Sequence, residues 1–414
     1  MFYGWFVVGG SFTTLFIAFG AAYSFTAFFD QLQGEFSASR ASVSLIFSIG
    51  ASLYFGLGAV SGAIADRINA RWVIAAGMFL LGVGLFWVSR AESLTEIYLG
   101  YGLGIGVGIG FAYAPAMGAV QRWFVKRRGL ASGLAVSGIG LGTAVVPPLV
   151  TALIHWSDWR SAYLVLAAVA MIGGVAAALL IESSPARRGQ FPDGAKARGP
   201  AGPSGPPGDD GLTLAQALRS KPFWVLYVAG LLASIGISMP FVHMMPFVQD
   251  LGLGKATGAA MLGLIGLAST IGRFLVGAVA DRIGRRRALI GINLGLALAA
   301  AWWAFSTTTW QLSLFAVVFG ICYGGFVALS PAVTADYFSV RSISAVIGAG
   351  FTAASIAMFA GPILAGYAFD VMQSYWLPLS LSAGLALVAA LAILLIEEPE
   401  AWRRMRAAQE EAKP

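Results

Sequence analysis

The stretch Met261–Arg282 reads MLGLIGLASTIGRFLVGAVADR, an apolar run long enough to cross a bilayer, with one guanidinium inside it at Arg273. Arg273 lies eight residues before Asp281, where the charges of the next loop begin. A helix rises about 1.5 Å per residue, so the guanidinium lies roughly 12 Å below the surface of a hydrocarbon core ~30 Å thick. A permanent cation costs at least about 2.5–3.5 kcal/mol there, so the fold must turn Arg273 toward a polar cavity or a partner.

The composition is that of a polytopic membrane protein. Hydrophobic residues make up 58% of the 414 residues and charged residues only 11%, a balance that soluble domains do not tolerate. The 53 glycines fit closely packed transmembrane helices, where small residues let backbones approach. The single cysteine, Cys322, excludes an intramolecular disulfide. The formal charge of +7 is explained by basic loops rather than by nucleic-acid binding.

Twelve apolar segments can be drawn along the chain, and each is expected to be a helix. Their approximate ranges are 4–29, 41–65, 72–89, 94–121, 129–154, 160–181, 223–249, 257–280, 288–306, 310–335, 342–369 and 374–396. Met1–Gly4 carries no basic n-region, so Tyr3–Phe29 is expected to be a retained first span. Glu182–Gly211, rich in Pro, Gly and charge, is predicted to be disordered. The following LTLAQALRSKPFW is predicted to contain a short amphipathic helix on the membrane surface.

The basic residues predict orientation and domain limits. Of the 26 Lys and Arg residues, 21 fall in loops and tail on one side, four on the other, and Arg273 lies within a span. The positive-inside rule then places both termini and the central linker in the cytoplasm. The predicted parts are an N-terminal six-helix bundle (1–181), a linker with the short helix (182–221), a C-terminal six-helix bundle (222–397) and a tail (398–414).

The two halves repeat at an offset of 215 residues. The sequence GAIADRINAR at 62–71 matches GAVADRIGRR at 277–286, and LIE at 180–182 matches LIE at 395–397. Two related six-helix bundles with a cargo site between them at mid-depth are a transporter design. The predicted fold class is an all-α membrane protein with twelve transmembrane helices in two pseudo-symmetric six-helix bundles.

The repeated GxxADRxxxR motif resembles the loop signature of the major facilitator superfamily, and the resemblance extends over the whole chain because both halves carry it. It implies the major facilitator fold. Asp66 and Arg67, with Asp281 and Arg282, stand where their helices end, and the acids can bond backbone or arginines of a neighbouring helix. They are predicted to form a conformational latch; the alternative is that the motif only anchors the loops by their positive charge.

A finer resemblance is to the monocarboxylate transporters and the related oxalate:formate exchangers. It rests on Tyr3-Gly4-Trp5, on RWFVKRRGLASG at 122–133, and on Arg273 near the middle of the eighth span. The resemblance implies that Arg273 binds the carboxylate of the substrate. Many animal members place Asp four residues before that arginine, where this chain has Ser269, so an aspartate proton relay is not assumed here. The resemblance to the oxalate exchanger implies a second cation, a lysine in the eleventh span. The eleventh span of this chain, 342–369, holds no Lys or Arg, which favours a monocarboxylate over a dicarboxylate as the substrate.

The acids of the sequence support the same reading of Arg273. None of the 19 Asp and Glu residues lies deep within a span. A bidentate pair with the carboxylate of a cargo is therefore the natural match for the guanidinium. The alternative is a structural pin held by backbone carbonyls and water.

Four further residues are candidates for contact with the cargo. His243 lies between Pro240 and Pro246 in the seventh span, where it can carry a proton or bond the substrate; a neutral imidazole bonded to a neighbour is the alternative. Tyr113 in the fourth span is expected at about the depth of Arg273. The other two candidates are Tyr323 and Ser269, and Ser269 lies one helical turn from Arg273. For Tyr113 and Tyr323, ordinary helix packing is the alternative explanation.

The residues and the resemblance together predict a secondary active transporter of small monocarboxylates such as lactate or pyruvate. Proton-coupled symport by alternating access is expected, with His243 and Arg273 as proton-coupling candidates. No cofactor, metal or nucleic acid is expected, and the protein is predicted to act as a monomer in the plasma membrane. An exchanger of the oxalate:formate type is the alternative. The acidic group of a drug exporter is missing, and the chain has no HExxH, paired intramembrane carboxylates or P-loop, which disfavours an enzyme.

Overall fold

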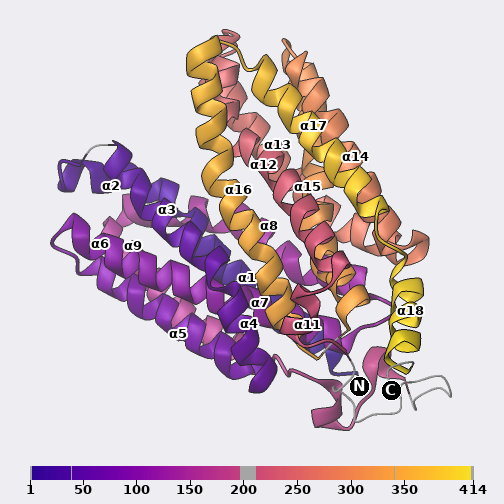
Figure 1. Cartoon of the computed structure of the whole chain (residues 1–414). Coiled ribbons are helices and arrows are strands. Elements are labelled where there is room, and N and C mark those ends of the chain that lie inside the picture. The colour runs from indigo at the N-terminus through magenta and orange to yellow at the C-terminus, as the bar shows by residue number, and fades with distance from the viewer. Residues whose placement is uncertain (1, 39, 196–210, 340, 412–414) are drawn as a thin grey trace. The chain divides into compact units, whose positions relative to one another are not determined.

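The computed structural model describes residues 2–38, 40–195, 211–339 and 341–411. Their regular structure is helical, apart from one isolated bridge between Gly211 and Ser339. Twelve helices in these ranges are long and apolar enough to cross a membrane, which confirms the predicted all-α, twelve-span fold (Figure 1). Residues 196–210 of the predicted linker and 412–414 of the predicted tail lie outside the described residues.

The chain divides into two compact units. Unit 1 consists of Met1–Lys126, Leu134–Gly208 and Ser344–Ser355, and unit 2 consists of Arg127–Gly133, Asp209–Ile343 and Ile356–Pro414. Each unit therefore includes a short stretch from the other half of the sequence, at or near the start of a transmembrane helix.

The first six spans are formed by helices of the N-terminal half. Their bounds are α1 (Gly4–Tyr23), α2 (Phe25–Glu35), α3 (Arg40–Gly56), α4 (Gly58–Arg67), α5 (Ala70–Ser89), α6 (Leu94–Tyr101), η1 (Gly102–Val107), α7 (Gly108–Trp123), α8 (Arg128–Trp156), α9 (Trp159–Ala168), η2 (Val169–Gly174) and α10 (Val175–Leu179). Helix α5 packs against α7 and α9, and α1 packs against α7. At Gly104 a Cβ would lie 2.9 Å from the Cα of Gly84, so the glycine run of the fourth span serves close helix packing.

The C-terminal half supplies the other six spans. The bounds are α11 (Leu214–Leu218), α12 (Lys221–Asp250), α13 (Lys255–Ile283), α14 (Arg285–Ala304), α15 (Thr309–Phe338), α16 (Ile343–Met372), α17 (Trp376–Leu394) and α18 (Pro399–Glu411). In unit 2, α13 packs along α15, α14 packs on α15 and α17, and α12 packs on α17. The predicted short helix before the seventh span is α11, which begins with a capping box between Thr213 and Gln216.

Polar caps begin several of these helices. The Asn69 side chain accepts from the backbone N–H of Arg71 at the start of α5. At the start of α9 the N–H of Ser161 donates to Asp158 Oδ1 at 2.7 Å, and this bond lowers the pKa of the Asp158 carboxyl. Both caps satisfy N–H groups that have no partner within their own helix.

The start of the predicted linker is ordered, so the prediction of disorder from Glu182 onward was wrong for residues 182–195. Glu182 is buried and accepts from Asn69 and, at 2.6 Å, from Arg71, while its carbonyl accepts from the Trp123 indole at 2.7 Å. A short 3₁₀ turn, η3 (Pro185–Arg188), follows. These specific bonds compensate for the low apolar content on which the prediction of disorder was based.

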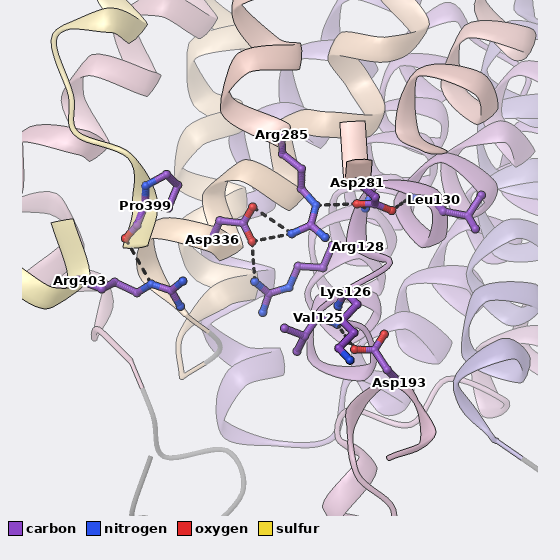
Figure 2. Close-up of polar contacts among 11 residues, drawn as sticks. Val125, Lys126, Arg128, Leu130, Asp193, Asp281, Arg285, Asp336, Pro399 and Arg403 are labelled. Atoms are coloured by element: carbon purple, nitrogen blue, oxygen red, sulfur yellow. Dashed lines mark hydrogen bonds and ion pairs between the residues drawn. The ribbon is translucent and has the colours of Figure 1, made fainter. Parts of the chain in front are cut away.

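Residues 188–193 continue over the same part of unit 1. Gln190 Oε1 accepts from the backbone N–H of Tyr3 at 3.0 Å, and the Arg188 guanidinium lies 3.7 Å from the Tyr3 ring centroid. Asp193 Oδ2 accepts from the backbone N–H groups of Val125 and Lys126 at 3.1 and 2.9 Å (Figure 2). The segment thus fixes both the start of α1 and the loop after α7.

We expect Asp193→Ala to lower the free energy of unfolding by about 1–3 kcal/mol, because two N–H groups lose a charged acceptor. Asp193 also has a φ of 56°, which alanine disfavours and asparagine tolerates. Asp193→Asn, which keeps an acceptor oxygen, should retain most of the stability. Thermal unfolding in detergent measures the difference, and equal melting temperatures for wild type and Asp193→Ala would show that the loop is held by other means.

Candidate functional site

The side chain of Arg273 is buried on α13, the helix that forms the eighth span. Arg273 is 2% exposed, and it lies 18 residues after Lys255 and 10 before Ile283 on α13. At a rise of about 1.5 Å per residue it is roughly 27 Å and 15 Å from those two ends. The guanidinium therefore lies well inside the span, as the sequence indicates.

The Tyr323 side chain borders this guanidinium. Arg273 Cζ lies 5.8 Å from the centroid of the Tyr323 ring on α15, a cation–π distance. The contact depends on Gly324, because a Cβ there would collide with the carbonyl oxygen of Ser269 and lie 3.0 Å from the backbone nitrogen of Arg273. Glycine lets the α15 backbone approach α13 and brings Tyr323 next to Arg273.

Ser269 belongs to the same group of residues. It is buried one turn before Arg273, on the same face of α13. Its Oγ donates to the carbonyl of Gly266 at 2.9 Å, which leaves the hydroxyl oxygen able to accept a further bond. Arg273, Tyr323 and Ser269, three of the five predicted substrate-binding residues, are thus brought together in unit 2.

The acids that end α13 and α15 bond other arginines of unit 2. Asp336 accepts from Arg128 Nη1 and Arg285 Nη1, both at 2.8 Å, and Arg285 Nε also donates to Asp281 at 2.7 Å (Figure 2). Asp281 is about 12 Å along the helix axis from Arg273. These carboxylates balance the charges at the predicted cytoplasmic ends of the helices.

Asp66 bonds the start of α16 within unit 1. The backbone N–H groups of Ser344 and Ala345 donate to its two carboxylate oxygens at 3.2 and 2.9 Å. Arg122 forms an ion pair with the same carboxylate. The first N–H groups of a helix have no partner within the helix and carry partial positive charge, so a carboxylate there is stabilising.

Asp281 repeats this arrangement in unit 2. The N–H groups of Gly129 and Leu130, at the start of α8, donate to its two oxygens at 2.8 and 2.9 Å. Gly129 and Leu130 precede Ser344 and Ala345 by 215 residues, the same offset that relates the two halves of the sequence. The internal repeat therefore extends from sequence to hydrogen bonding.

The arginines of this arrangement differ from those singled out in the sequence. The side chains of Arg67 and Arg282 are exposed, and the arginines bonded to Asp66 and Asp281 are Arg122 and Arg285. The sequence motifs do not identify Arg122, Arg128, Arg285 or Asp336 as partners. Arg122 and Arg128 lie in the RWFVKRR motif, but their partners Asp66 and Asp336 are 56 and 208 residues away along the chain. No local sequence pattern therefore predicts these ion pairs.

His243 contacts the start of the last span. Its Nδ1 lies 3.4 Å from the hydroxyl of Tyr375, and both residues are buried in unit 2. His243 lies 22 residues after Lys221 on α12, roughly 33 Å from that end, whereas Arg273 is roughly 15 Å from the corresponding end of α13. The two residues thus lie at different depths.

A series of aromatic rings runs between these two depths in unit 2. Tyr323 stacks on Phe319 (6.1 Å, 13°), Phe319 on Phe315 (5.3 Å), and Phe315 on Trp303 (4.7 Å). The series continues through ring contacts of Trp303 with Phe247 and of Phe247 with Tyr375, the partner of His243. Aromatic packing accounts for this part of the unit 2 core.

Tyr113 belongs to unit 1, where it is 9% exposed. Its ring is 4.7 Å from that of Phe351 and 6.2 Å from that of Phe19, both in edge-to-face contact. Contact between the Tyr113 hydroxyl and a substrate stays a prediction. Among the described residues, no three His, Cys, Asp or Glu side chains gather as metal ligands would.

Comparisons with known proteins point to one family. A family model described as the Major Facilitator Superfamily matches residues 11–290 and 264–413. Monocarboxylate transporter 13 of Bos taurus is 28% identical over 376 residues, 90% of this chain and 84% of the relative. Monocarboxylate transporter 12-B of Danio rerio is 27% identical over 412 residues, 95% of this chain and 86% of the relative.

Solved structures share the fold. The human organic anion transporter MFSD10 superposes with a TM-score of 0.71 at 18% identity, covering 94% of this chain and 99% of that structure. The E. coli fucose:proton symporter FucP gives a TM-score of 0.67 at 15% identity, covering 93% and 97%. At these identities the likeness concerns the arrangement of the helices.

Proposed function

The chain belongs to the major facilitator superfamily, and from this premise we propose that it is a secondary active transporter of small monocarboxylates such as lactate and pyruvate. The observation that carries the proposal is Arg273, a guanidinium 2% exposed and well inside an apolar span. Because insertion of a cation into an apolar span costs free energy, Arg273 is expected to have a function. The names of the two relatives, monocarboxylate transporters, support a carboxylate as the substrate.

The proposed binding mode uses the groups gathered around Arg273. The guanidinium donates two parallel hydrogen bonds to the substrate carboxylate, a geometry that lysine cannot reproduce. Ser269 Oγ, which donates its proton to Gly266, can accept a bond from the same small molecule, and Tyr323 covers one side of the cation. Tyr113 is a further candidate for contact with the substrate from unit 1.

Transport is proposed to follow alternating access, coupled to protons. Binding of the anion neutralises Arg273, and this lowers the cost of the occluded form relative to the open forms. The carboxylate–backbone bonds of Asp66 and Asp281 are proposed to stabilise one conformation and to break in the other. His243, bonded to Tyr375 nearer the predicted outer end, is the candidate that carries the proton.

The setting is proposed to be the plasma membrane, with both termini in the cytoplasm and a monomer as the functional form. The basic bias of the loops supports the orientation. The relatives and fold neighbours are transporters and not enzymes. The alternative of an oxalate:formate exchanger finds no support among them.

The test is uptake of labelled lactate and pyruvate into proteoliposomes. A symporter should accumulate either acid when the outside is more acidic than the lumen, and a protonophore should abolish the accumulation. Uptake by an exchanger would instead require carboxylate inside the vesicles and would not depend on the pH gradient. Absence of uptake for both acids under both regimes would refute the proposed substrate class.

A further inference from the structure

We propose that the Arg273 site prefers monocarboxylates that carry an aromatic side group, and that Phe241 and Tyr323 bind that group. This inference rests on the proposed function, because it takes Arg273 as the carboxylate-binding residue. It goes further by assigning two aromatic side chains of unit 2 as determinants of substrate specificity.

The Tyr323 ring, which borders Arg273, belongs to a group of three aromatic rings in mutual contact. The Phe241 ring on α12 meets that of Tyr323 at 5.4 Å and 66°, and that of Phe319 at 6.4 Å and 63°. Tyr323 and Phe319 lie one turn apart on α15 with nearly parallel rings. Since Tyr323 also borders the guanidinium, this group of rings begins where the carboxylate would bind.

The three rings differ in how much surface remains uncovered. Phe319 is buried and belongs to the core, whereas Phe241 is 42% exposed and Tyr323 is partly exposed. The uncovered surface therefore belongs to Tyr323, which borders Arg273, and to Phe241, which contacts Tyr323. Aromatic faces and edges attract a further ring in an offset or edge-to-face arrangement.

The local backbone favours adjustment of Phe241. Pro240 directly precedes it, and a proline cannot donate to the carbonyl four residues earlier. The helix therefore lacks one backbone hydrogen bond in the turn that leads into Phe241. A small rotation of the ring can adapt it to substrates of different size.

A substrate such as lactate offers only a methyl group to this surface, which leaves most of the apolar faces of Phe241 and Tyr323 uncovered. A phenyl group covers far more apolar area and adds ring contacts. The carboxylate on Arg273 and the phenyl ring on Tyr323 and Phe241 would be bound by adjacent groups. Phenyllactate and phenylpyruvate have this combination of groups at suitable separation.

The experiment compares ligands and variants of the full-length protein. Thermal stabilisation in detergent gives apparent affinities for lactate, pyruvate, phenyllactate and phenylpyruvate, and competition against labelled lactate uptake provides a second readout. In the wild type the phenyl compounds should bind at least about tenfold more tightly than their methyl counterparts. Phe241→Ala should reduce this ratio toward one, and Phe241→Leu should leave an intermediate ratio.

The control is Phe359→Ala on α16, an exposed phenylalanine outside the ring contacts around Arg273, which should keep the wild-type ratio. The melting temperature without ligand shows that each variant is folded. If lactate binds but the phenyl compounds bind no more tightly, or if Phe241→Ala weakens both classes equally, the inference is overturned and the proposed function stands. If neither class binds the wild type, the proposed function itself fails.

Discussion

Arg273→Ala should abolish carboxylate uptake in proteoliposomes, and Arg273→Lys should reduce it at least about a hundredfold. Alanine removes the cation that is proposed to bind the carboxylate of the substrate. Lysine keeps the charge but loses the planar pair of donors that matches a carboxylate, and its ammonium is more strongly hydrated. A tenfold change in rate corresponds to about 1.4 kcal/mol. Loss of one bidentate charged pair is therefore enough to explain a hundredfold fall in the uptake rate.

Folding of the Arg273 variants should be preserved. Removal of a buried cation also removes the cost of its insertion, so the melting temperature without ligand should remain close to that of the wild type. Arg287→Lys, at a side chain 73% exposed, is the matched control and should transport normally. Uptake at the wild-type rate by Arg273→Ala would contradict the assignment.

The second large effect is on stability. Asp336→Ala should lower the free energy of unfolding by about 3–5 kcal/mol, because it leaves two largely buried guanidinium groups without this carboxylate. Arg128, with a side chain 6% exposed, and Arg285, at 11%, both donate to Asp336 (Figure 2). The loss should be partly offset by Asp281, which also accepts from Arg285.

Thermal and denaturant unfolding in detergent measure this effect. Asp250→Ala, at an exposed acid that ends α12, is the control for loss of one negative charge and should change the melting temperature little. Adding Arg128→Met to Asp336→Ala should recover part of the stability, since it removes one buried charge that lost its partner. A melting temperature for Asp336→Ala within one degree of the wild type would show that water balances these charges.

The sequence was sufficient for the features that depend on local apolarity. Each span is a long apolar run, so its existence and approximate limits follow from bilayer thickness alone. The depth of Arg273 follows in the same way from its distance to Asp281. The proximity of Ser269 to Arg273 follows from the helical repeat, because both lie on α13.

Contacts between distant residues were not predictable in this way. Tyr375 as the partner of His243, and Asp336 as the partner of Arg128, depend on how separate helices pack. The ordered segment 182–195 was missed because its composition is typical of disorder, while its order comes from bonds such as those of Glu182 to Asn69 and Arg71. Once the backbone bonds of Asp66 are known, the 215-residue offset predicts the matching bonds of Asp281. The offset alone predicts neither set.

The most direct measurement of the central claim is stabilisation of the purified protein by carboxylate, compared between wild type and Arg273→Gln. A ligand that binds only the folded form stabilises it by about 2.7 kcal/mol at a concentration of 100 Kd. The wild-type melting temperature should therefore rise steadily with lactate concentration, and that of Arg273→Gln should stay constant. An equal rise in both proteins would show that the carboxylate binds elsewhere, and would contradict the account.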